Sequence, residues 1–479
     1  MGELSGVGAR PPPDVPGPAA RALADASPRV FWLDDPDRLA PLPSLRGPES
    51  ADLLVVGGGY TGLWAALRAK ERDPSRDVVL VEAGHCGDQA SGRNGGFASA
   101  SLTHGFANGL ARWPDELAEL DWLGTENLAA MAATVRRHDI DCGWEETGEL
   151  TVATATHELD DLATYASALT AAGHDVRLLD RDKVRTEVDS PTYLGGLWER
   201  GSTAMVEPAR LAWGLRQAVL DAGVRVYEGT QASALDAHAG AMHVRTQHGE
   251  VRAARVLLGT NAFPSLLRRL RLMTVPVYDY VLVTEPLTSG QKASIGWAGR
   301  QGVGDASNLF HYYRLTRDDR ILWGGYDAVY RFGSRIDRAL EQGGTHDLLA
   351  SQFLATFPQL EGLRFTHRWA GVIDTCTRFA AFFGTAHHGR VAYALGYTGL
   401  GVAATRFGAD VALDLLGGEE TSRTRLRMVR EKPLPFPPEP LRYTGVQLTR
   451  WSLARADANG GRRNLWLRAL DRAGLGFDS

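Results

Sequence analysis

A glycine-rich turn between an apolar strand and a helix constrains the fold of this 479-residue chain more than any other feature. Residues 52–56 form a short apolar run that is typical of a buried parallel strand. Gly57, Gly59 and Gly62 follow, and residues 62–72 alternate small and apolar side chains at helical spacing. The first glycine permits a tight turn, the second lets a pyrophosphate approach the backbone, and the third lets helix and strand pack closely. The motif predicts a Rossmann-like unit that binds a dinucleotide.

A carboxylate after the next apolar strand supports this prediction. Residues 78–81 are typical of a second buried strand, and Glu82 follows 20 residues after Gly62. We expect Glu82 to accept hydrogen bonds from the adenosine ribose hydroxyls and to repel a 2′-phosphate. The start of the intervening helix, at Tyr60 and Thr61, would offer N–H groups and a partial positive charge to the pyrophosphate. The motif alone does not distinguish FAD from NAD.

Composition identifies a soluble globular protein. Hydrophobic residues make up 44% of the chain and charged residues 23%, which excludes a wholly disordered or collagen-like chain. The net charge of −5 argues against nucleic-acid binding over the whole surface. The first thirty residues do not resemble a signal peptide, and no apolar run reaches the ~18 residues of a membrane span.

Cysteine usage narrows the chemistry further. The three cysteines are odd in number and far apart, so a disulfide scaffold and a zinc module are both disfavoured. We therefore expect a cytoplasmic protein without a metal ion.

The remaining pattern predicts an α/β protein with a second, antiparallel sheet. Residues 275–284 alternate with period two and carry aromatics, which suits one face of such a sheet, and residues 309–326 are typical of a hairpin. Residues 391–416 predict a strand, a glycine turn and a helix. Further helices are predicted at 115–138, 157–172 and 208–220, and further strands at 148–153, 224–228, 242–246 and 255–259.

A second glycine-rich segment, at residues 91–96, follows Glu82 after a short loop and exposes backbone donors. With the motif at residues 57–62 and the strand at 78–81, it resembles the FAD-dependent D-amino-acid oxidase superfamily. Its ASGRNGG form is similar to the gamma-glutamylputrescine oxidoreductase-like branch. The resemblance implies FAD as the cofactor, and we expect FAD to be held without a covalent bond. It also implies that the flavin is lined by Ser91, Arg93, Asn94, Gly95 and Gly96.

The resemblance continues over residues 50–420. Residues 228–235 match the strand beside the adenine, which places Ala232 there. The turn at residues 396–401 and the helix after it match the family's helix at the pyrimidine end of the flavin. The N–H groups and dipole of that helix would stabilise negative charge on the reduced ring. The residues implied are Gly399, Leu400, Gly401 and Val402.

By this resemblance the fold is α/β, with a Rossmann-like FAD-binding domain interleaved with a substrate domain built on a mixed antiparallel β-sheet. We expect the FAD-binding domain at residues 50–110, 195–265 and 360–420, the substrate domain at 111–194 and 266–359, a Pro-rich N-terminal arm at 1–49 and a basic C-terminal extension at 421–479.

Relatives oxidise a C–N bond by hydride transfer to flavin N5, and water then hydrolyses the imine. The same resemblance predicts an amine or amino acid as substrate. Among the aromatics of the substrate segments we favour Tyr280, Tyr312 and Tyr397 as substrate-facing groups. Arg314 or Arg378 could clamp a carboxylate, but a surface position is the simpler expectation for both. Two alternatives stay open: oxidative N-demethylation of a sarcosine-like amine, and a non-catalytic flavin-binding protein whose tail docks a partner.

Two departures from the family concern the flavin. Some relatives carry a lysine that promotes reaction with oxygen, but residues 322–325, where it would align, contain none. The sequence therefore leaves open whether the electron acceptor is O2, as in an oxidase, or another compound, as in a dehydrogenase. Some relatives bind FAD through a cysteine, and Cys376 lies near that region, but we interpret it as a buried free thiol.

The C-terminal extension carries 12 Lys and Arg against 5 Asp and Glu, or +7, and the rest of the chain carries −12. It could bind an anionic lipid, a nucleic acid or an acidic protein. We favour a helical cap on the acidic body because the charges are complementary. The sequence leaves the oligomeric state open.

Overall fold

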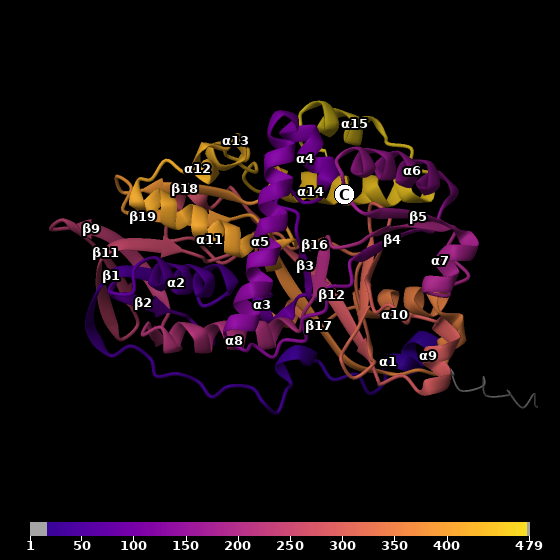
Figure 1. Ribbon diagram of the computed structural model, residues 1–479, viewed down its shortest axis with the longest axis horizontal. Coiled ribbons are helices and arrows are strands. Elements are labelled where there is room, and N and C mark those ends of the chain that lie inside the picture. Colours follow the sequence, from indigo (N-terminus) through magenta and orange to yellow (C-terminus); the bar gives the residue numbers. More distant parts are fainter. Residues whose placement is uncertain (1–16, 477–479) are drawn as a thin grey trace, which may run out of the picture.

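The computed structural model describes residues 17–476 and contains two large β-sheets side by side (Figure 1). One sheet has eight strands and the other has nine. The mixed α/β architecture confirms the predicted fold class. No helix within residues 17–476 has the length and apolar character needed to cross a membrane.

The eight-stranded sheet carries the first glycine motif. Its main strands follow the order β18-β19-β11-β1-β2-β8, and all neighbouring pairs except β18–β19 are parallel. The apolar halves of β1 and β2 are buried on both faces, as expected for a covered parallel sheet. The strands are β1 (Gly47–Val56), β2 (Val78–Val81), β8 (Arg225–Tyr227), β9 (Ala232–His238), β10 (Ala241–Thr246), β11 (Gly249–Leu258), β18 (Phe382–Ala386) and β19 (Val391–Leu395).

Helices bury one face of this sheet. Leu63, Leu211 and Leu413, each from a different helix, belong to one apolar cluster with Val55 of β1 and Leu80 of β2. The helices on this side of the molecule are α2 (Tyr60–Arg72), α5 (Leu117–Arg137), α8 (Pro208–Asp221) and α11 (Gly401–Gly417), with the short α3 (Ala90–Arg93) beside them.

The nine-stranded sheet is mixed: β13 and β4 pair in parallel, and the other pairs are antiparallel. Its strands run β16-β12-β15-β14-β13-β4-β6-β5, and β17 also pairs with β12. They are β4 (Glu149–Ala153), β5 (Val176–Asp180), β6 (Gly195–Glu199), β12 (Val275–Thr284), β13 (Gly302–Asp305), β14 (His311–Leu315), β15 (Ile321–Gly325), β16 (Val329–Tyr330) and β17 (Phe365–Thr375).

Shorter elements complete the described chain. A small sheet pairs β3 (Phe97–Ser99) with β7 (Thr203–Met205). The remaining helices are α4 (Phe106–Arg112), α6 (Thr156–Ala171), α7 (Arg181–Glu187), α9 (Ser289–Ile295) and α10 (Thr345–Thr356), with 3-10 turns at Phe31–Leu33, Pro114–Glu116, Arg268–Leu270, Arg338–Glu341 and Pro358–Leu360.

The predicted domain boundaries differ from the sheets at two strands. We assigned residues 195–265 and 360–420 to the nucleotide-binding part, but β6 and β17 lie in the nine-stranded sheet. Both strands stand at crossovers between the two sheets, where the sequence has no composition shift to mark the change.

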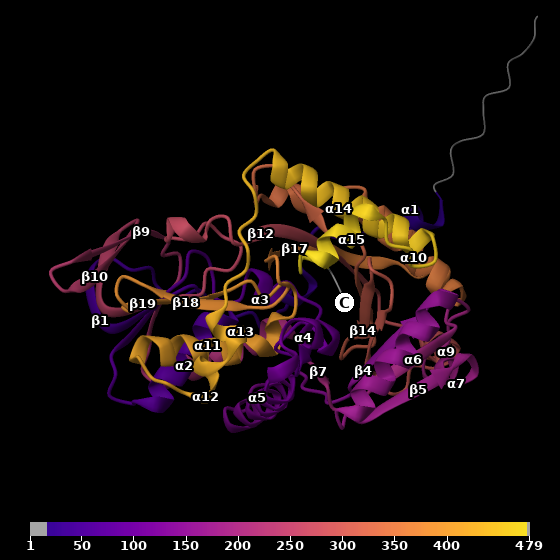
Figure 2. The same cartoon turned by 90° about the horizontal axis from the view of Figure 1, so that it is seen from above.

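Both ends of the described chain pack on this body. The arm begins with α1 (Pro18–Leu23), and the indole N–H of Trp32 donates to the Asn94 carbonyl at 2.9 Å. The extension contains α12 (Ser422–Arg425), α13 (Arg427–Arg430), α14 (Leu441–Ala458) and α15 (Leu465–Arg472). Leu453 and Leu467 pack against Leu309 of the body, and α14 and α15 lie above the nine-stranded sheet in Figure 2. The predicted arm residues 1–16 lie outside the described residues.

Candidate functional site

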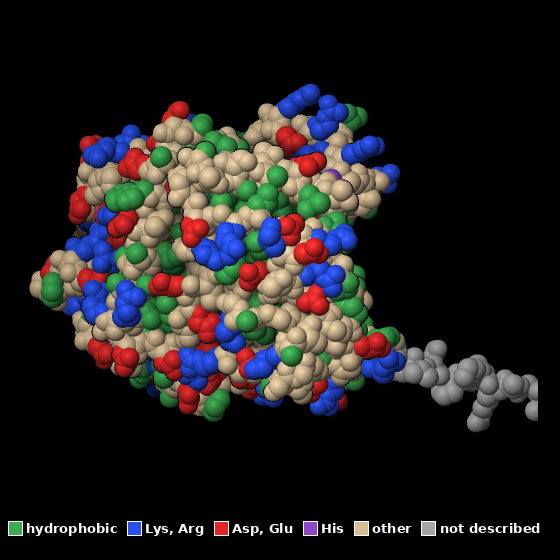
Figure 3. All heavy atoms as spheres, turned by 45° about the vertical axis from the view of Figure 1, so that its right-hand side comes forward, with side chains coloured by type: hydrophobic (Ala, Val, Ile, Leu, Met, Phe, Trp, Pro, Cys, Tyr) green, Lys and Arg blue, Asp and Glu red, His purple; other side chains and the backbone are tan. Residues whose placement is uncertain are grey.

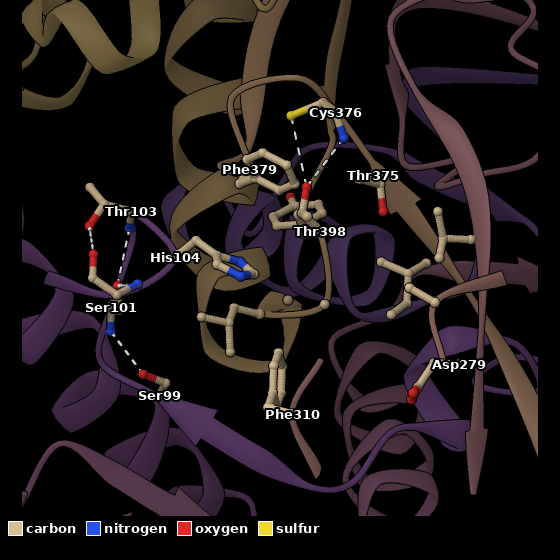
Figure 4. A pocket seen from close by; sticks show the side chains of 18 of the residues that line it. Ser99, Ser101, Thr103, His104, Asp279, Phe310, Thr375, Cys376, Phe379 and Thr398 are labelled. Carbon is tan, nitrogen blue, oxygen red and sulfur yellow. Dashed lines mark hydrogen bonds between the residues drawn. The ribbon is translucent and has the colours of Figure 1, made fainter. Parts of the chain in front are cut away.

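A cavity of about 1650 Å³ lies between the two sheets. Gly59, Tyr60 and Thr61 line it from the start of α2, and residues 399–402 line it from the start of α11. Strands β12 and β14 of the nine-stranded sheet supply another part of its wall. The cavity therefore connects the starts of α2 and α11 with the sheet that we predicted to hold the substrate. Figure 4 shows part of its lining, with Thr398 and Asp279 on different sides.

The first turn has the close approaches that its motif predicts. Gly57 has φ +109°, and a Cβ there would lie 2.5 Å from the Gly259 carbonyl oxygen. A Cβ on Gly62 would lie 1.8 Å from the Gly57 oxygen, so both positions exclude side chains. The Tyr60 N–H donates to the Ser91 hydroxyl at 2.9 Å, which joins the turn to the second glycine segment.

Glu82 follows β2 and lies beside this turn. Its carboxylate accepts the N–H groups of Gly58 at 2.6 Å and Gly84 at 2.8 Å. Burial raises the pKa of Glu82, while these two hydrogen bonds lower it. The side chain therefore holds the backbone around the turn, and its ribose contact stays a prediction. Ala232 starts β9 and is not among the residues that line the cavity.

The second glycine segment is held by the body around it. The Arg93 guanidinium forms an ion pair with Glu341 at 2.7 Å, and the Asn94 amide donates to Ala90 and Ser91 carbonyls of its own segment. Ser91, Arg93, Asn94 and Gly95 line the cavity, whereas Gly96 lies beside it. Sequence reasoning missed the pairing of Arg93 with Glu341 because Glu341 is distant in the chain.

Asp374 positions the turn at residues 396–401, between β19 and α11, and sequence reasoning missed this role. Its carboxylate accepts the N–H groups of Gly396 at 2.5 Å and Tyr397 at 3.1 Å. Burial raises the pKa of Asp374 to about 7 against the lowering effect of these bonds. The turn it holds leads directly into α11.

Cys376 is a buried thiol that donates to the Ala380 carbonyl, with Sγ and O 3.2 Å apart. Burial raises its pKa, which keeps the sulfur protonated. This environment agrees with our interpretation of a free thiol. Figure 4 shows it next to Thr398, across the pocket from Asp279.

The three tyrosines occupy different places. Tyr312 lines the cavity; a Cβ on Gly95 would lie 2.6 Å from its ring, so the ring packs on the second glycine segment. Tyr397 also lines the cavity, but its hydroxyl accepts from Thr61 at 3.1 Å and joins α11 to α2.

The expectation that Tyr280 faces the substrate does not match its position. Its hydroxyl donates to the Leu340 carbonyl at 2.9 Å, its ring packs on His346, and it is not among the cavity-lining residues. Because side chains alternate along β12, Tyr278 and Tyr280 share the covered face, and the residue between them faces the cavity.

That residue is Asp279, which sequence reasoning missed. Protein surrounds its carboxylate, part of which is open to the cavity, and the Tyr312 hydroxyl donates to it. Enclosure raises the pKa of Asp279 to about 6 despite this hydrogen bond. An acidic residue inside the apolar run VPVYDYVLVT was the signal that could have identified it.

The two candidate arginines are buried, which corrects the expected surface position. Arg314 is 1% exposed and donates to the Val206 carbonyl at 2.6 Å. Arg378 is 5% exposed and donates to the Ala380 carbonyl at 3.0 Å. Both guanidinium groups bind backbone carbonyls, so neither is arranged as a carboxylate clamp.

The C-terminal extension also forms cavity wall, which the sequence did not predict. Phe436, Leu453 and Trp466 are among its lining residues. In the described part of the chain, no lysine lines the cavity. On the face shown in Figure 3, basic side chains are interspersed with acidic ones over most of the surface.

Comparisons with known proteins agree with this geometry. The family model described as "FAD dependent oxidoreductase" (DAO) matches residues 52–415. Gamma-glutamylputrescine oxidoreductase of Escherichia coli K12 is 32% identical over 406 residues, which cover 81% of this chain and 89% of that protein. The probable oxidoreductase OrdL of Haemophilus influenzae is 29% identical over 405 residues, covering 82% and 89%.

Among solved structures, glycine oxidase from Geobacillus kaustophilus has a similar fold, with a TM-score of 0.67. It is 20% identical, and the likeness covers 80% of this chain and 99% of that one. The family match begins within β1, ends within α11, and leaves out the arm and the extension. The predicted resemblance is confirmed, and the chain belongs to the DAO family of FAD-dependent oxidoreductases.

Proposed function

We propose that this protein binds FAD without a covalent bond and oxidises the C–N bond of an amine or amino acid. One observation carries the proposal: a single cavity joins the glycine turns of two helix N-termini to Asp279 and Tyr312. Cofactor and substrate must meet in such an enzyme, and this cavity offers each of them a wall of suitable chemistry.

The residues at the two turns fit the cofactor. The first N–H groups of α2 and α11 lack partners within their helices, and both helix starts line the cavity. Such termini bind anionic groups, so the start of α2 at Thr61 suits a pyrophosphate, whereas the Tyr60 N–H already donates to the Ser91 hydroxyl. A Cβ on Gly59 would lie 3.0 Å from the Ser91 hydroxyl oxygen, so glycine keeps this approach open. Glu82, as an acceptor beside the turn, suits ribose hydroxyls.

Bound FAD would supply the hydride acceptor for the oxidation. The N–H groups of Gly399, Gly401 and Val402 and the dipole of α11 would stabilise negative charge at the pyrimidine end. The Leu400 N–H already donates to the Tyr397 carbonyl at 3.2 Å. Cys376 supports non-covalent binding because its thiol is buried and protonated. The largely apolar residues of the cavity wall would surround the reacting carbon, and water would hydrolyse the imine once it has formed.

The substrate class rests on chemistry and relatives together. Gamma-glutamylputrescine oxidoreductase and glycine oxidase are named for amine and amino-acid substrates. An acidic group on the cavity wall suits the cation of either class. The acceptor of the electrons is O2 or another compound, and the lack of a cavity-lining lysine within residues 17–476 is a reason to test both.

An anaerobic panel of amines and amino acids tests the proposal. We expect at least one compound to bleach the flavin absorbance of the purified holoprotein, and readmitted air or an artificial acceptor to restore it. Ammonia as a product identifies deamination, whereas formaldehyde identifies N-demethylation. A flavin that no compound of the panel reduces would contradict the catalytic proposal and favour a non-catalytic flavin-binding role.

A further inference from the structure

Asp279 is placed in the cavity by the strands on either side of it. On β17 its register partner is Gly371, which also lines the cavity and has no side chain to cover the carboxylate. The Tyr312 ring is held between two glycines, because a Cβ on Gly95 or Gly324 would lie 2.6 or 2.5 Å from ring atoms. This packing fixes the phenol so that its hydroxyl donates to Asp279.

The charged groups around Asp279 leave its negative charge without a counterion. Tyr312 faces it from β14, and Arg93 of α3, the nearest cation of the glycine segment, is paired with Glu341. From β15 the Gly325 backbone donates a hydrogen bond that favours the ionised form of Asp279. Helix α10 packs on the opposite face of β12, where Tyr280 lies. Within residues 17–476, no lysine, arginine or histidine forms an ion pair with Asp279. An enclosed carboxylate of this kind is stabilised by an incoming cation.

We infer that Asp279 binds the ammonium group of an aliphatic amine substrate and accepts its proton before the C–N bond is oxidised. This inference rests on the proposed function and narrows it to an amine recognised by its positive charge. Arg314 and Arg378 both bind backbone carbonyls. Neither of them is therefore free to bind the α-carboxylate of an amino acid.

The proton must leave because only a neutral amine has a lone pair to assist loss of hydride. A free alkyl ammonium has a pKa near 10 by analogy with lysine, so few molecules are neutral at pH 7. In the enclosed site, burial disfavours both charges, and moving the proton from nitrogen to a carboxylate oxygen neutralises the pair. The enclosure that raises the pKa of Asp279 to about 6 makes it a better acceptor than an exposed carboxylate.

The bonds and electrons then balance as follows. The N–H bond of the ammonium breaks and an O–H bond forms on Asp279. Where oxidised FAD is bound, it would supply the acceptor for a hydride, with its two electrons, from the substrate carbon, and a C=N bond would form in the substrate. Water adds to the resulting iminium ion and releases a carbonyl product and the nitrogen fragment. The Tyr312 hydroxyl stabilises the ionised form of Asp279, so Tyr312 is a positioning residue.

Binding of an inert cation provides the first test. Tert-butylamine has no hydrogen on the carbon bonded to nitrogen and cannot be oxidised, and tert-butanol is its neutral isostere. Titrations of the FAD-loaded protein, followed by flavin absorbance, should show tert-butylamine binding that weakens about 10-fold or more in Asp279→Asn. Tert-butanol should not distinguish the variant from wild type. Equal affinity of both proteins for tert-butylamine would overturn the inference.

The pH dependence of anaerobic flavin reduction provides the second test, with the fastest amine of the panel as substrate. We expect an acidic limb near pH 6 in the wild type. Asp279→Asn should remove this limb and lower the rate about 100-fold or more. Tyr312→Phe should move the limb to higher pH, because the carboxylate loses a donor. Tyr313→Phe is the matched control: its hydroxyl pairs with Tyr193 on the opposite face of β14, so the limb should not move.

Flavin content is measured first, and Tyr312→Phe keeps the test decisive if Asp279→Asn loses FAD. If amines reduce the wild-type flavin but the acidic limb persists in Asp279→Asn or stays in place in Tyr312→Phe, the role of Asp279 is wrong and the proposed function stands. If no amine reduces the wild-type flavin, the proposed function fails, and the tert-butylamine titration reports on the cation site separately.

Discussion

At the scale of single residues, Asp279 combines two opposing effects. Its enclosure disfavours the carboxylate, yet the cavity depends on that negative charge to attract a cation. Native proteins keep such costly groups where function requires them. The cost can be measured because the carboxylate ionises within an accessible pH range.

Replacing Asp279 with Asn should make the protein relatively more stable at high pH. The folded pKa is raised, so the folded state binds more protons than the unfolded state between pH 4 and 6, and wild-type stability falls as the pH rises through 6. The variant lacks this loss, which amounts to at most about 3 kcal/mol. Denaturant unfolding of both proteins at pH 5 and pH 8 measures the part of this loss that falls between these two pH values, about 1.4 kcal/mol. The exposed Asp236→Asn serves as control, and a pH-independent difference would contradict the prediction.

Glu82→Arg should weaken or abolish FAD binding. The substitution removes the acceptor of the Gly58 and Gly84 N–H groups and introduces a cation where we expect ribose hydroxyls. Glu82→Gln keeps an acceptor oxygen and should weaken binding less. Flavin occupancy of the purified variants, read from the ratio of visible to protein absorbance, compares them. Full occupancy in Glu82→Arg would contradict the assignment of this residue.

Residues that act through backbone geometry were the ones the sequence could predict. Gly57 and Gly62 follow from a motif whose spacing is set by steric limits, and both positions have the close backbone approaches that this motif requires. Their contact with a cofactor stays a prediction. Asp279 and Asp374 each depend on a partner that is distant in the sequence. The partner of Asp279 is Tyr312, and the partner of Asp374 is the turn before α11. Tyr280 was misplaced because an aromatic in a strand suits either face of a sheet.

At the scale of elements, the turn from β19 to α11 depends on a carboxylate from another strand. Asp374→Ala should leave the N–H groups of Gly396 and Tyr397 without their acceptor, at a cost of about 1–3 kcal/mol. We expect FAD affinity to fall about 10-fold, because the start of α11 loses its fixed position. Fluorescence titration of the apoprotein with FAD measures it. Asp182→Ala, which removes an exposed carboxylate that does not line the cavity, is the control and should bind FAD normally.

The accuracy of the predicted element boundaries depended on how apolar each segment is. Strand β12 matches the prediction of residues 275–284, because its alternating pattern spans its whole length. Strand β1 begins at Gly47 rather than residue 52, since a polar extension pairs with β11 without being buried. The partly exposed edge strand β5 was missed for the same reason. Tertiary pairing, rather than local sequence, determines such ends.

At the scale of the whole molecule, the extension is attached by apolar packing and by polar contacts with the body. The Asp457 carboxylate accepts N–H groups of Asn308 at 3.0 Å and Leu309 at 3.1 Å. Asp457→Ala should loosen α14 and increase its amide hydrogen exchange and proteolysis, leaving the eight-stranded sheet protected. Arg455→Ala, on the exposed side of α14, is the control. Unchanged exchange in Asp457→Ala would show that apolar packing alone holds the helix.

The predicted arrangement of two interleaved parts agrees with the two sheets, but their shared cavity could not be predicted. The cavity wall combines β12, β14, both helix starts and the extension, which are far apart in sequence. The charge difference between extension and body favoured a cap, and the packing of Leu453 and Leu467 on Leu309 agrees with it. The charge difference did not indicate that the extension would line the cavity.

The division of this wall has an evolutionary consequence. The family match ends within α11, and the part of the cavity formed by Phe436, Leu453 and Trp466 lies beyond it. Substitutions in the extension can therefore alter this part of the cavity wall and leave the residues at the starts of α2 and α11 unaltered. Evolution can change the shape of the cavity in this way without changing the turns at which we propose that FAD binds.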